Sequence, residues 1–344
     1  MTLVTFEALC AKPGVFQSMT GVSVEEFRSL LAQVSPRYEG VVRSRVERAD
    51  RKRAPGGGEK SRHDVTERLL MTLVWLRLYL TGEAVGFLFG VDKGTVSRFT
   101  RPILLILRDL GVETLGWPEE AVELARPDDQ DAVPPDPPVD APSDRAEPEE
   151  GPDESAGVSV VTPDEARCPD YLAIIDATEQ RVERPRDNAT QKRYYSGKRK
   201  CHTIKTQVIV NERGRIRHVS DSVPGSTHDL TLLRQSGVQA VLPTGLTATA
   251  DTGYRGLQND FPDRSVALPY RPKDKHRLTP EEKLHNHCIS RVRSVVENTL
   301  AELKHFRALN SVFRHCLDRY QEITRAIAGI INQRIDKRLA KLPL

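Results

Sequence analysis

The first hydrophobic pattern along the chain is helical. Residues 22–34 (VSVEEFRSLLAQV) predict one helix, with Ser23 as its N-cap. From residue 65 to residue 110, apolar residues again recur at three- and four-residue spacing. Four leucines mark the buried face of the first helix in this region: Leu69, Leu73, Leu76 and Leu80. The apolar run 69–80 has 12 residues and contains Arg77, so it predicts a buried helix that is too short to span a bilayer.

Residues 81–104 (TGEAVGFLFGVDKGTVSRFTRPIL) predict two helices joined by a tight turn. The first stops at Gly90, and the second starts after Asp92, a good N-cap. This is the pattern of a helix-turn-helix, whose second helix enters the major groove of DNA. Its side chains available to phosphates or base edges would be Lys93, Thr95, Ser97, Arg98 and Arg101. Two ordinary core helices joined by a turn would give the same pattern.

The C-terminal half begins with strand-like patterns. Residues 171–182 (YLAIIDATEQRV) predict a strand, and residues 205–223 predict a hairpin that turns at Glu212–Gly214. A short helix over 228–237 and a strand over 247–254 (TATADTGY) follow, and then a loop to about Lys275.

Two helices are expected to close the chain. Thr279, Pro280 and Glu282 combine a capping box with proline at the first helical position, so a long helix should start there and run to about Ala308. A last helix is expected near 317–339. Strand, hairpin, helix, strand and long helix in this order match a ribonuclease H-like α/β fold.

Composition divides the chain further. Its 344 residues leave room for about two domains. Residues 43–53 (RSRVERADRKR) are expected to form a basic connector, lying along a phosphate backbone or simply solvated. Residues 126–167 hold nine prolines and few large apolar side chains, which predicts a disordered linker. We therefore expect four parts: a helix and connector over 1–60, a helix-turn-helix domain over 61–125, the linker, and a catalytic domain over 168–344.

Charge is strongly segregated along the chain. Residues 126–167 carry 13 acidic residues against three arginines, a net charge of −10, so the remainder carries +13 of the overall +3. A basic remainder favours a polyanionic partner. The five cysteines form no CxxC pair, and the first residues show no secretion signal. We expect reduced thiols and a cytoplasmic, nucleoid-associated protein without a membrane partner.

Three acidic residues in distant segments are the main candidates for chemistry. Asp176 follows the apolar run LAII, Asp251 follows TATA, and Glu297 lies on the long helix. Arg293 and Lys304 fall within roughly 40° of Glu297 on that helix. A carboxylate in a buried strand is costly unless a cation compensates it, and hard divalent cations prefer oxygen ligands. Aspartates satisfied by backbone amides and a solvated helix face are the alternatives.

These segments resemble the DDE transposases of bacterial insertion sequences and their Harbinger-like relatives. Arg293, Glu297 and Lys304 match the family spacing of Arg, three residues, Glu, six residues, Lys, although Ser290 stands where many members carry Tyr. Residues 194–205 (YYSGKRKCHTIK) resemble the family's serine-glycine-lysine turn.

Residues 223–233 (VPGSTHDLTLL) resemble the family's glycine-histidine-aspartate segment, whose aspartate is often treated as a further metal ligand. That residue is Asp229 here. Ser226 and Asp229 also form a capping-box-like pair for the following helix, which leaves the role of Asp229 open.

The resemblance implies a transposase that binds the ends of its mobile element and cuts and joins DNA with two Mg²⁺ or Mn²⁺ ions. Asp176, Asp251 and Glu297 would be the catalytic ligands, with Asp229 as a possible fourth. Five basic side chains would contact DNA phosphates near the metals: Lys198, Arg199, Lys200, Arg293 and Lys304.

The partners implied are double-stranded DNA, both element ends and target, and a second copy of the chain when two ends are paired. Two other functions remain open: a domesticated DNA-binding protein that does not cut, and a non-transposing metal endonuclease on the same fold.

Overall fold

The computed structural model describes residues 3–46, 63–117, 172–243, 245–262, 264–272 and 277–341. The acidic segment 126–167 and most of the basic connector 43–53 lie outside these residues, as does Cys168. The expected boundaries between the four parts also fall outside them, so that division stays a prediction.

The described elements of the N-terminal part are all helices. Its helices are α1 (Phe6–Cys10), α2 (Pro13–Thr20), α3 (Val24–Val46), α4 (Val65–Leu78), α5 (Gly82–Phe89) and α6 (Lys93–Glu113). Ser23 caps α3 as expected: its Oγ accepts from the Glu26 N–H, and Glu26 Oε2 accepts from the Ser23 N–H. The helix continues to Val46, well past the expected end at residue 34, so the first residues of the expected connector are helical.

Helix α4 is buried on every side. Residues 69–76 are all buried, so the middle of the helix has no exposed polar face opposite the predicted leucine face. The helix ends at Leu78 because Tyr79 adopts a left-handed conformation, φ 52°, which places Leu80 outside it. None of the helices in the described parts of the chain is long and apolar enough to cross a membrane.

The C-terminal part is built on one mixed sheet. Its central strands are β1 (Leu172–Arg181), β3 (Cys201–Val210), β6 (Thr247–Ala250) and β7 (Val266–Ala267), in the order β3-β1-β6-β7. Strand β1 runs antiparallel to β3 and parallel to β6. Three short strands pair with the other edge of β3: β2 (Tyr195–Ser196), β4 (Ile216–Val219) and β5 (Val223–Pro224). The β3–β4 hairpin turns where the sequence predicts it.

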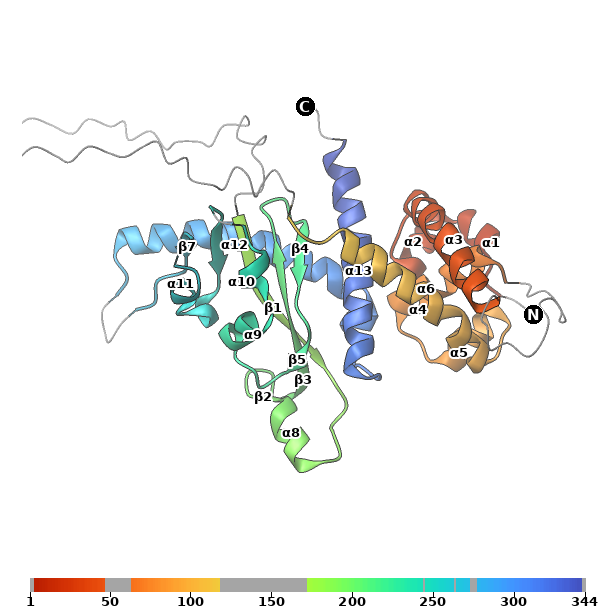
Figure 1. Cartoon of the computed structure of the whole chain (residues 1–344), viewed down its shortest axis with the longest axis horizontal. Coiled ribbons are helices and arrows are strands. Elements are labelled where there is room, and N and C mark those ends of the chain that lie inside the picture. The colour runs from red at the N-terminus through yellow and green to blue at the C-terminus, as the bar shows by residue number, and fades with distance from the viewer. Residues whose placement is uncertain are drawn as a thin grey trace, which may run out of the picture.

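Helices cover both faces of the sheet. One face packs against α9 (Asp229–Gln235), α10 (Val238–Val241) and α11 (Leu257–Asp260) through a hydrophobic cluster of its own. The other face packs against α12 (Pro280–Lys304) and α13 (Leu317–Leu339), in a cluster that continues into the N-terminal helices. The remaining elements are α8 (Asn188–Tyr194) and the 3₁₀ turns η2 (Thr252–Tyr254) and η3 (Arg307–Leu309). Figure 1 shows α13 standing between the sheet and the N-terminal helices.

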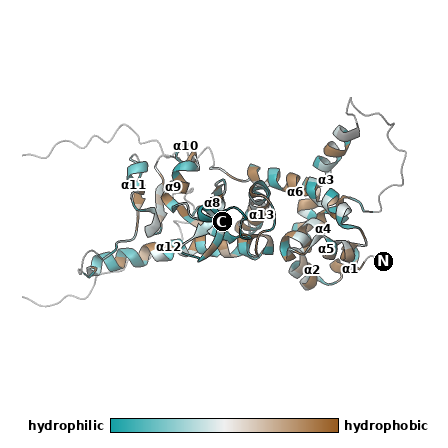
Figure 2. Cartoon of the chain, turned by 90° about the horizontal axis from the view of Figure 1, so that it is seen from below, coloured by the Kyte–Doolittle hydropathy of each residue, from teal (hydrophilic) through white to brown (hydrophobic). Residues whose placement is uncertain are grey.

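The two long C-terminal helices begin as predicted. Thr279 and Glu282 form the full capping box of α12, with Pro280 at its first position. This helix ends at Lys304, before the expected Ala308, and η3 follows. Hydrophilic and hydrophobic residues alternate along α12 in Figure 2, which suits a helix with one face on the sheet. The segment after β6 is not a simple loop, because it contains η2, α11 and β7.

Candidate functional site

Two of the candidate carboxylates meet because of strand pairing. In the parallel pair β1 and β6, Ile175 is registered with Ala250. The next residues, Asp176 and Asp251, therefore follow side by side, Asp176 inside the long strand β1 and Asp251 at the carboxyl end of β6. The expectation that these strands are neighbours is confirmed.

Asp229 reaches the same place from the first turn of α9. All three aspartates line one cavity of about 210 Å³. Gly253 lies between two of them, since a Cβ at this position would be 2.9 Å from both Asp229 Oδ2 and Asp251 Oδ1. A residue with a side chain could not stand there without moving the carboxylates.

Each strand aspartate has one oxygen held by the backbone. The Ala177 N–H donates to Asp176 Oδ1 at 2.8 Å, and the Gly253 N–H donates to Asp251 Oδ1 at 2.7 Å. Backbone amides thus satisfy one oxygen of each carboxylate. This agrees with the alternative given for these aspartates from the sequence, in which backbone amides rather than a cation satisfy them.

Negative charge accumulates in this cavity. The pKa of Asp176 is raised to about 6, mainly by burial. The carboxylates of Asp251 and Asp229 add to the rise, while the Ala177 amide and Arg293 oppose it. Two carboxylates side by side, whose ionisation is made costly by burial and by their neighbours, supply the oxygen donors that a hard divalent cation prefers.

Sequence reasoning missed a cation inside the cavity. Lys205 is buried, and its Nζ donates to Asp229 Oδ1 at 2.8 Å and to the Thr227 carbonyl at 2.7 Å. Glu179 lies 3.8 Å from the same Nζ. Lys205 and Glu179 face each other in the β1–β3 register, which no local pattern reveals.

The expected capping pair of Ser226 and Asp229 is wrong. His228 is the N-cap of α9, because its ring accepts from the Leu230 N–H. The Ser226 hydroxyl instead donates to the carbonyl of Arg193. Asp229 is therefore free of a Ser226 cap and is bound to Lys205 in the cavity.

The expected helix stripe brings two of its three residues toward the cavity. Arg293 is mostly buried and close enough to lower the pKa of Asp176. Lys304 is half-buried. Its pKa is lowered first by burial and also by Arg199, while Asp176 and Glu179 favour its charged form.

Glu297 lies apart from the cavity. Its side chain is 58% exposed, and its Oε1 lies 3.6 Å from Nη2 of Arg293. Among the residues that the structure describes, no three His, Cys, Asp or Glu are grouped so that they could hold a metal ion. Asp176 and Asp251 meet as expected, and a ligand role for Glu297 stays a prediction.

The helix-turn-helix pattern forms as predicted. Gly90 ends α5 in a left-handed conformation, φ 68°, and Asp92 caps α6 by accepting from the Thr95 N–H. A side chain at Gly86 would collide with the carbonyl of Val91, so glycine allows the close turn.

The candidate DNA contacts on α6 differ in their surroundings. Ser97 and Arg98 are exposed. Lys93 pairs with Glu83 at the surface, at 2.7 Å, and Thr95 bonds Asp92 and Arg98. Arg101 instead forms a double hydrogen bond with Glu322 of α13, so it holds two helices together.

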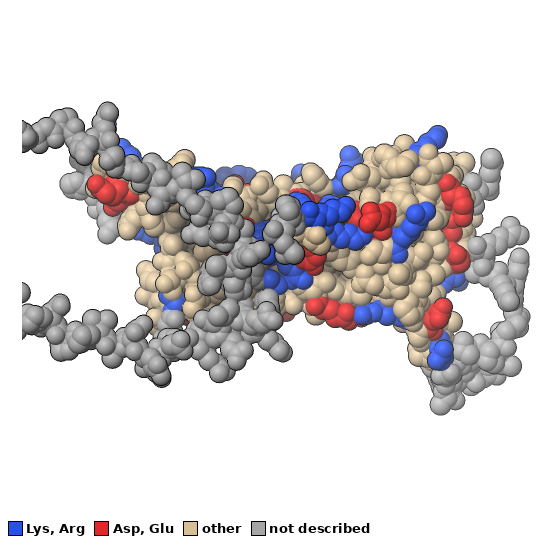
Figure 3. Space-filling model, turned by 90° about the horizontal axis from the view of Figure 1, so that it is seen from above, with Lys and Arg blue, Asp and Glu red and all other residues tan. Residues whose placement is uncertain are grey.

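Besides the basic residues of α6, a group of three basic residues lies at the rim of the cavity that the aspartates line. Lys198, Arg199 and Lys200 occupy the exposed turn between β2 and β3. Lys198 lines the cavity, and Arg199 is close to Lys304. This turn lies low in the view of Figure 1, so the Lys and Arg side chains that gather in the middle of the face in Figure 3, which is seen from above, belong to another side of the molecule.

A mixed sheet covered on both faces, neighbouring strands that each present an aspartate, and a separate helix-turn-helix define a ribonuclease H-like protein with a DNA-binding element. Comparison with known families agrees. Residues 175–332 match the family described as DDE superfamily endonuclease, and residues 64–113 match the helix-turn-helix of DDE superfamily endonuclease. The sheet-containing part and the helix-turn-helix part of the chain therefore both match this superfamily.

One curated relative is similar over almost the full length. It is the "Probable transposase for insertion sequence element IS702" of Microchaete diplosiphon, which is 25% identical over 317 residues, covering 90% of this chain and 98% of that protein. No solved structure matches the chain.

Proposed function

We propose that this protein is a transposase that binds the ends of its own mobile element and cleaves and joins DNA by in-line displacement at phosphodiesters. The observation that carries the proposal is the cavity in which Asp176, Asp229 and Asp251 meet, next to the basic turn 197–200. Acidic groups in the cavity suit metal binding, and basic groups at its rim suit DNA phosphates.

Asp176, Asp251 and Glu297, with Asp229 as a fourth, would hold Mg²⁺ or Mn²⁺, two ions in our proposal. When bound, such ions stabilise charge on phosphate oxygens and lower the pKa of water. The resemblance and the position on α12 support Glu297, and the shared cavity supports the three aspartates.

The other residues would position the DNA. Arg293 and Lys304 approach the carboxylates from α12, and guanidinium and ammonium groups bind phosphate well. Lys198, Arg199 and Lys200 would hold the backbone at the rim of the cavity, where Arg199 lies near Lys304. Helix α6 would recognise the element ends through Lys93, Thr95, Ser97 and Arg98, whereas Arg101 would first have to leave Glu322. Pairing two ends requires at least two copies of the chain.

Asp176→Asn tests the proposal on DNA that carries the element's own ends. The variant should bind these ends like the wild type but lose strand cleavage by at least about a hundredfold, because it removes the carboxylate charge at the centre of the cavity. Asp109→Asn is the control. Asp109 is exposed on α6, pairs with Arg108 and does not line the cavity. Arg98→Ala should do the reverse and weaken binding to the ends.

Cleavage that survives in Asp176→Asn, or that proceeds fully in EDTA, would refute the proposal. The exposed position of Glu297 favours one alternative, a DNA-binding protein that does not cut. That alternative predicts no cleavage by the wild type with either Mg²⁺ or Mn²⁺. A non-transposing nuclease would cleave but would not transfer a pre-cut end into plasmid DNA.

A further inference from the structure

A second cavity lies beyond the carboxylates, where α11, β7 and the first turn of α12 meet, at the end of α12 remote from α13 (Figure 1). Its volume is about 640 Å³, within the range of pockets that take a small organic ligand. Three arginines line it, Arg255, Arg271 and Arg277, against one acid, Glu282. Glu282 is already used in the capping box of α12, so the lining favours an anion.

Two of these arginines have no partner of opposite charge among the residues that the structure describes. Arg255 and Arg277 are exposed and form no ion pair with any residue in the described ranges. Arg271 donates to the hydroxyl of Thr252, which directly follows Asp251. The segment 251–256 therefore connects the carboxylate cavity to the arginine-lined pocket.

The pocket also presents an aromatic ring on a fixed backbone. Tyr270 is 51% exposed, yet its N–H donates to Asn286 Oδ1 at 2.7 Å and its carbonyl accepts from Asn286 Nδ2 at 2.9 Å. The ring of His285 lies 4.9 Å from the Tyr270 ring, and Pro269 and Pro272 restrict the chain around it. A large apolar ring is thus held at the surface without being buried.

Fixed aromatic rings beside unpaired cations are the features by which proteins bind single-stranded nucleic acid, because every base can stack on a ring while cations contact the backbone. A duplex stacks its bases inside and offers none to Tyr270. We propose that this pocket holds unpaired nucleotides of the DNA strand whose phosphodiester lies at the aspartates, with a base stacked on Tyr270 and phosphates at Arg255 and Arg277. This inference rests on the proposed function, since it assigns the path of the same strand.

The test measures binding of the full chain in EDTA to dye-labelled duplexes that are blunt or carry a short single-stranded tail of either polarity. Wild type should bind one tailed duplex about tenfold more tightly than the blunt one, within the range expected for stacking one base on an aromatic side chain. Tyr270→Ala should lose this preference while keeping its affinity for the blunt duplex. Tyr270→Phe, which retains the ring, should keep the preference.

Two further variants complete the design. Leu284→Ala is the matched control, because Leu284 is 65% exposed on α12 but does not line the pocket. Arg277→Gln should reduce the salt dependence of tailed-duplex binding by about one phosphate contact. A preference that persists in Tyr270→Ala, or equal binding of blunt and tailed duplexes by wild type, would overturn the inference.

The measurement also separates this inference from the proposed function. It needs no cleavage, so Asp176→Asn should keep the preference for tailed DNA. If the wild type did not cleave DNA at all, the transposase proposal would be refuted. The preference for tailed DNA would still be decided by the binding measurement alone.

Discussion

At the scale of single residues, burial determines which titratable groups depart from their ordinary behaviour. Asp176 is held in a cavity with other carboxylates, and a cation can compensate its charge. His218 of β4 is also largely buried, but without chemistry nearby: its Nδ1 has no hydrogen-bond partner among the described residues. Burial, together with Arg325, lowers the pKa of His218 to about 4, while Asp221 opposes this shift.

The His218 shift predicts a pH-dependent stability. The folded pKa of about 4 lies below the ordinary 6.5, so the unfolded chain binds the additional proton between these values. This contribution to stability is complete above pH 6.5 and is lost as the pH falls toward 4. The loss amounts to about 3 kcal/mol at most.

His218→Phe should remove this part of the pH dependence, because phenylalanine keeps a ring of similar size and does not titrate. Urea denaturation at pH 7.5 and at pH 4.5 measures it. Wild type should lose about 2.5 kcal/mol more than the variant between the two pH values, because titration is not complete at pH 4.5. Parallel losses in both proteins would show that His218 does not carry the effect.

At the scale of elements, the close crossing of α6 and α13 depends on two glycines. Gly329 of α13 lies against the backbone of Gly111 in α6, and Gly111 lies against the carbonyl of Arg325. A Cβ at either position would overlap the other helix. Because α6 is also the second helix of the helix-turn-helix, this crossing sets the position of the DNA-binding helix.

Gly329→Ala should destabilise the protein by about 2 kcal/mol, since a methyl group in a closely packed crossing forces the helices apart. Thermal denaturation followed by circular dichroism measures this effect. Gly40→Ala is the matched control: Gly40 lies within α3, and a Cβ there would meet nothing within 4 Å.

The control variant should gain about 0.5–1 kcal/mol, because alanine is the better helix former. An unchanged melting temperature in Gly329→Ala would mean that the crossing can widen without cost.

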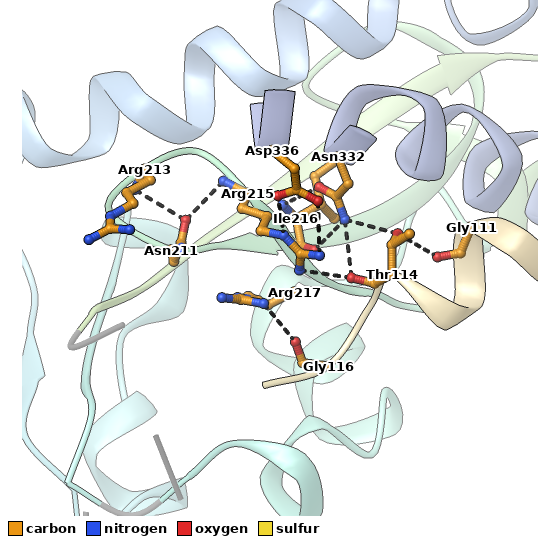
Figure 4. A network of polar contacts seen from close by, with 10 residues as sticks. All are labelled: Gly111, Thr114, Gly116, Asn211, Arg213, Arg215, Ile216, Arg217, Asn332 and Asp336. Atoms are coloured by element: carbon orange, nitrogen blue, oxygen red, sulfur yellow. Dashed lines mark hydrogen bonds and ion pairs between the residues drawn. The ribbon is translucent and has the colours of Figure 1, made fainter. Parts of the chain in front are cut away.

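At the scale of the whole molecule, one buried amide connects the N-terminal helices to the sheet. Asn332 of α13 is fully buried. Its Oδ1 accepts from the Ile216 N–H at 2.8 Å, and its Nδ2 donates to the Ile216 carbonyl at 2.9 Å and to the Thr114 hydroxyl at 3.1 Å. Figure 4 shows these bonds together with Arg215, which bridges Asp336 and the Thr114 carbonyl.

Asn332→Ala should lower the free energy of unfolding by about 3 kcal/mol, because it leaves the N–H and carbonyl of Ile216 buried without partners. It should also reduce cleavage at element ends more than binding to them, since it loosens the connection between α6 and the catalytic cavity. Asn259→Ala, at an exposed position of α11, is the control. Equal reductions of binding and cleavage would argue against such a mechanical connection.

Local sequence patterns determined the elements of this protein. The capping box at Thr279, the turn at Gly90 and Asp92, and the last helix at 317–339 all formed where they were predicted. Each depends on residues within a few positions of one another, so a hydrogen bond or a glycine decides it locally. The apolar runs that lead to Asp176 and Asp251 were visible for the same reason.

Contacts between distant segments decided the rest. The placement of Lys205 beside Asp229, the use of Arg101 by Glu322 and the exposure of Glu297 depend on strand register and helix docking. A polar side chain could pair with many groups along the chain, and the residues next to it in sequence do not determine which one it meets. Only the folded arrangement fixes which charges meet, and the cavity owes its chemistry to that selection.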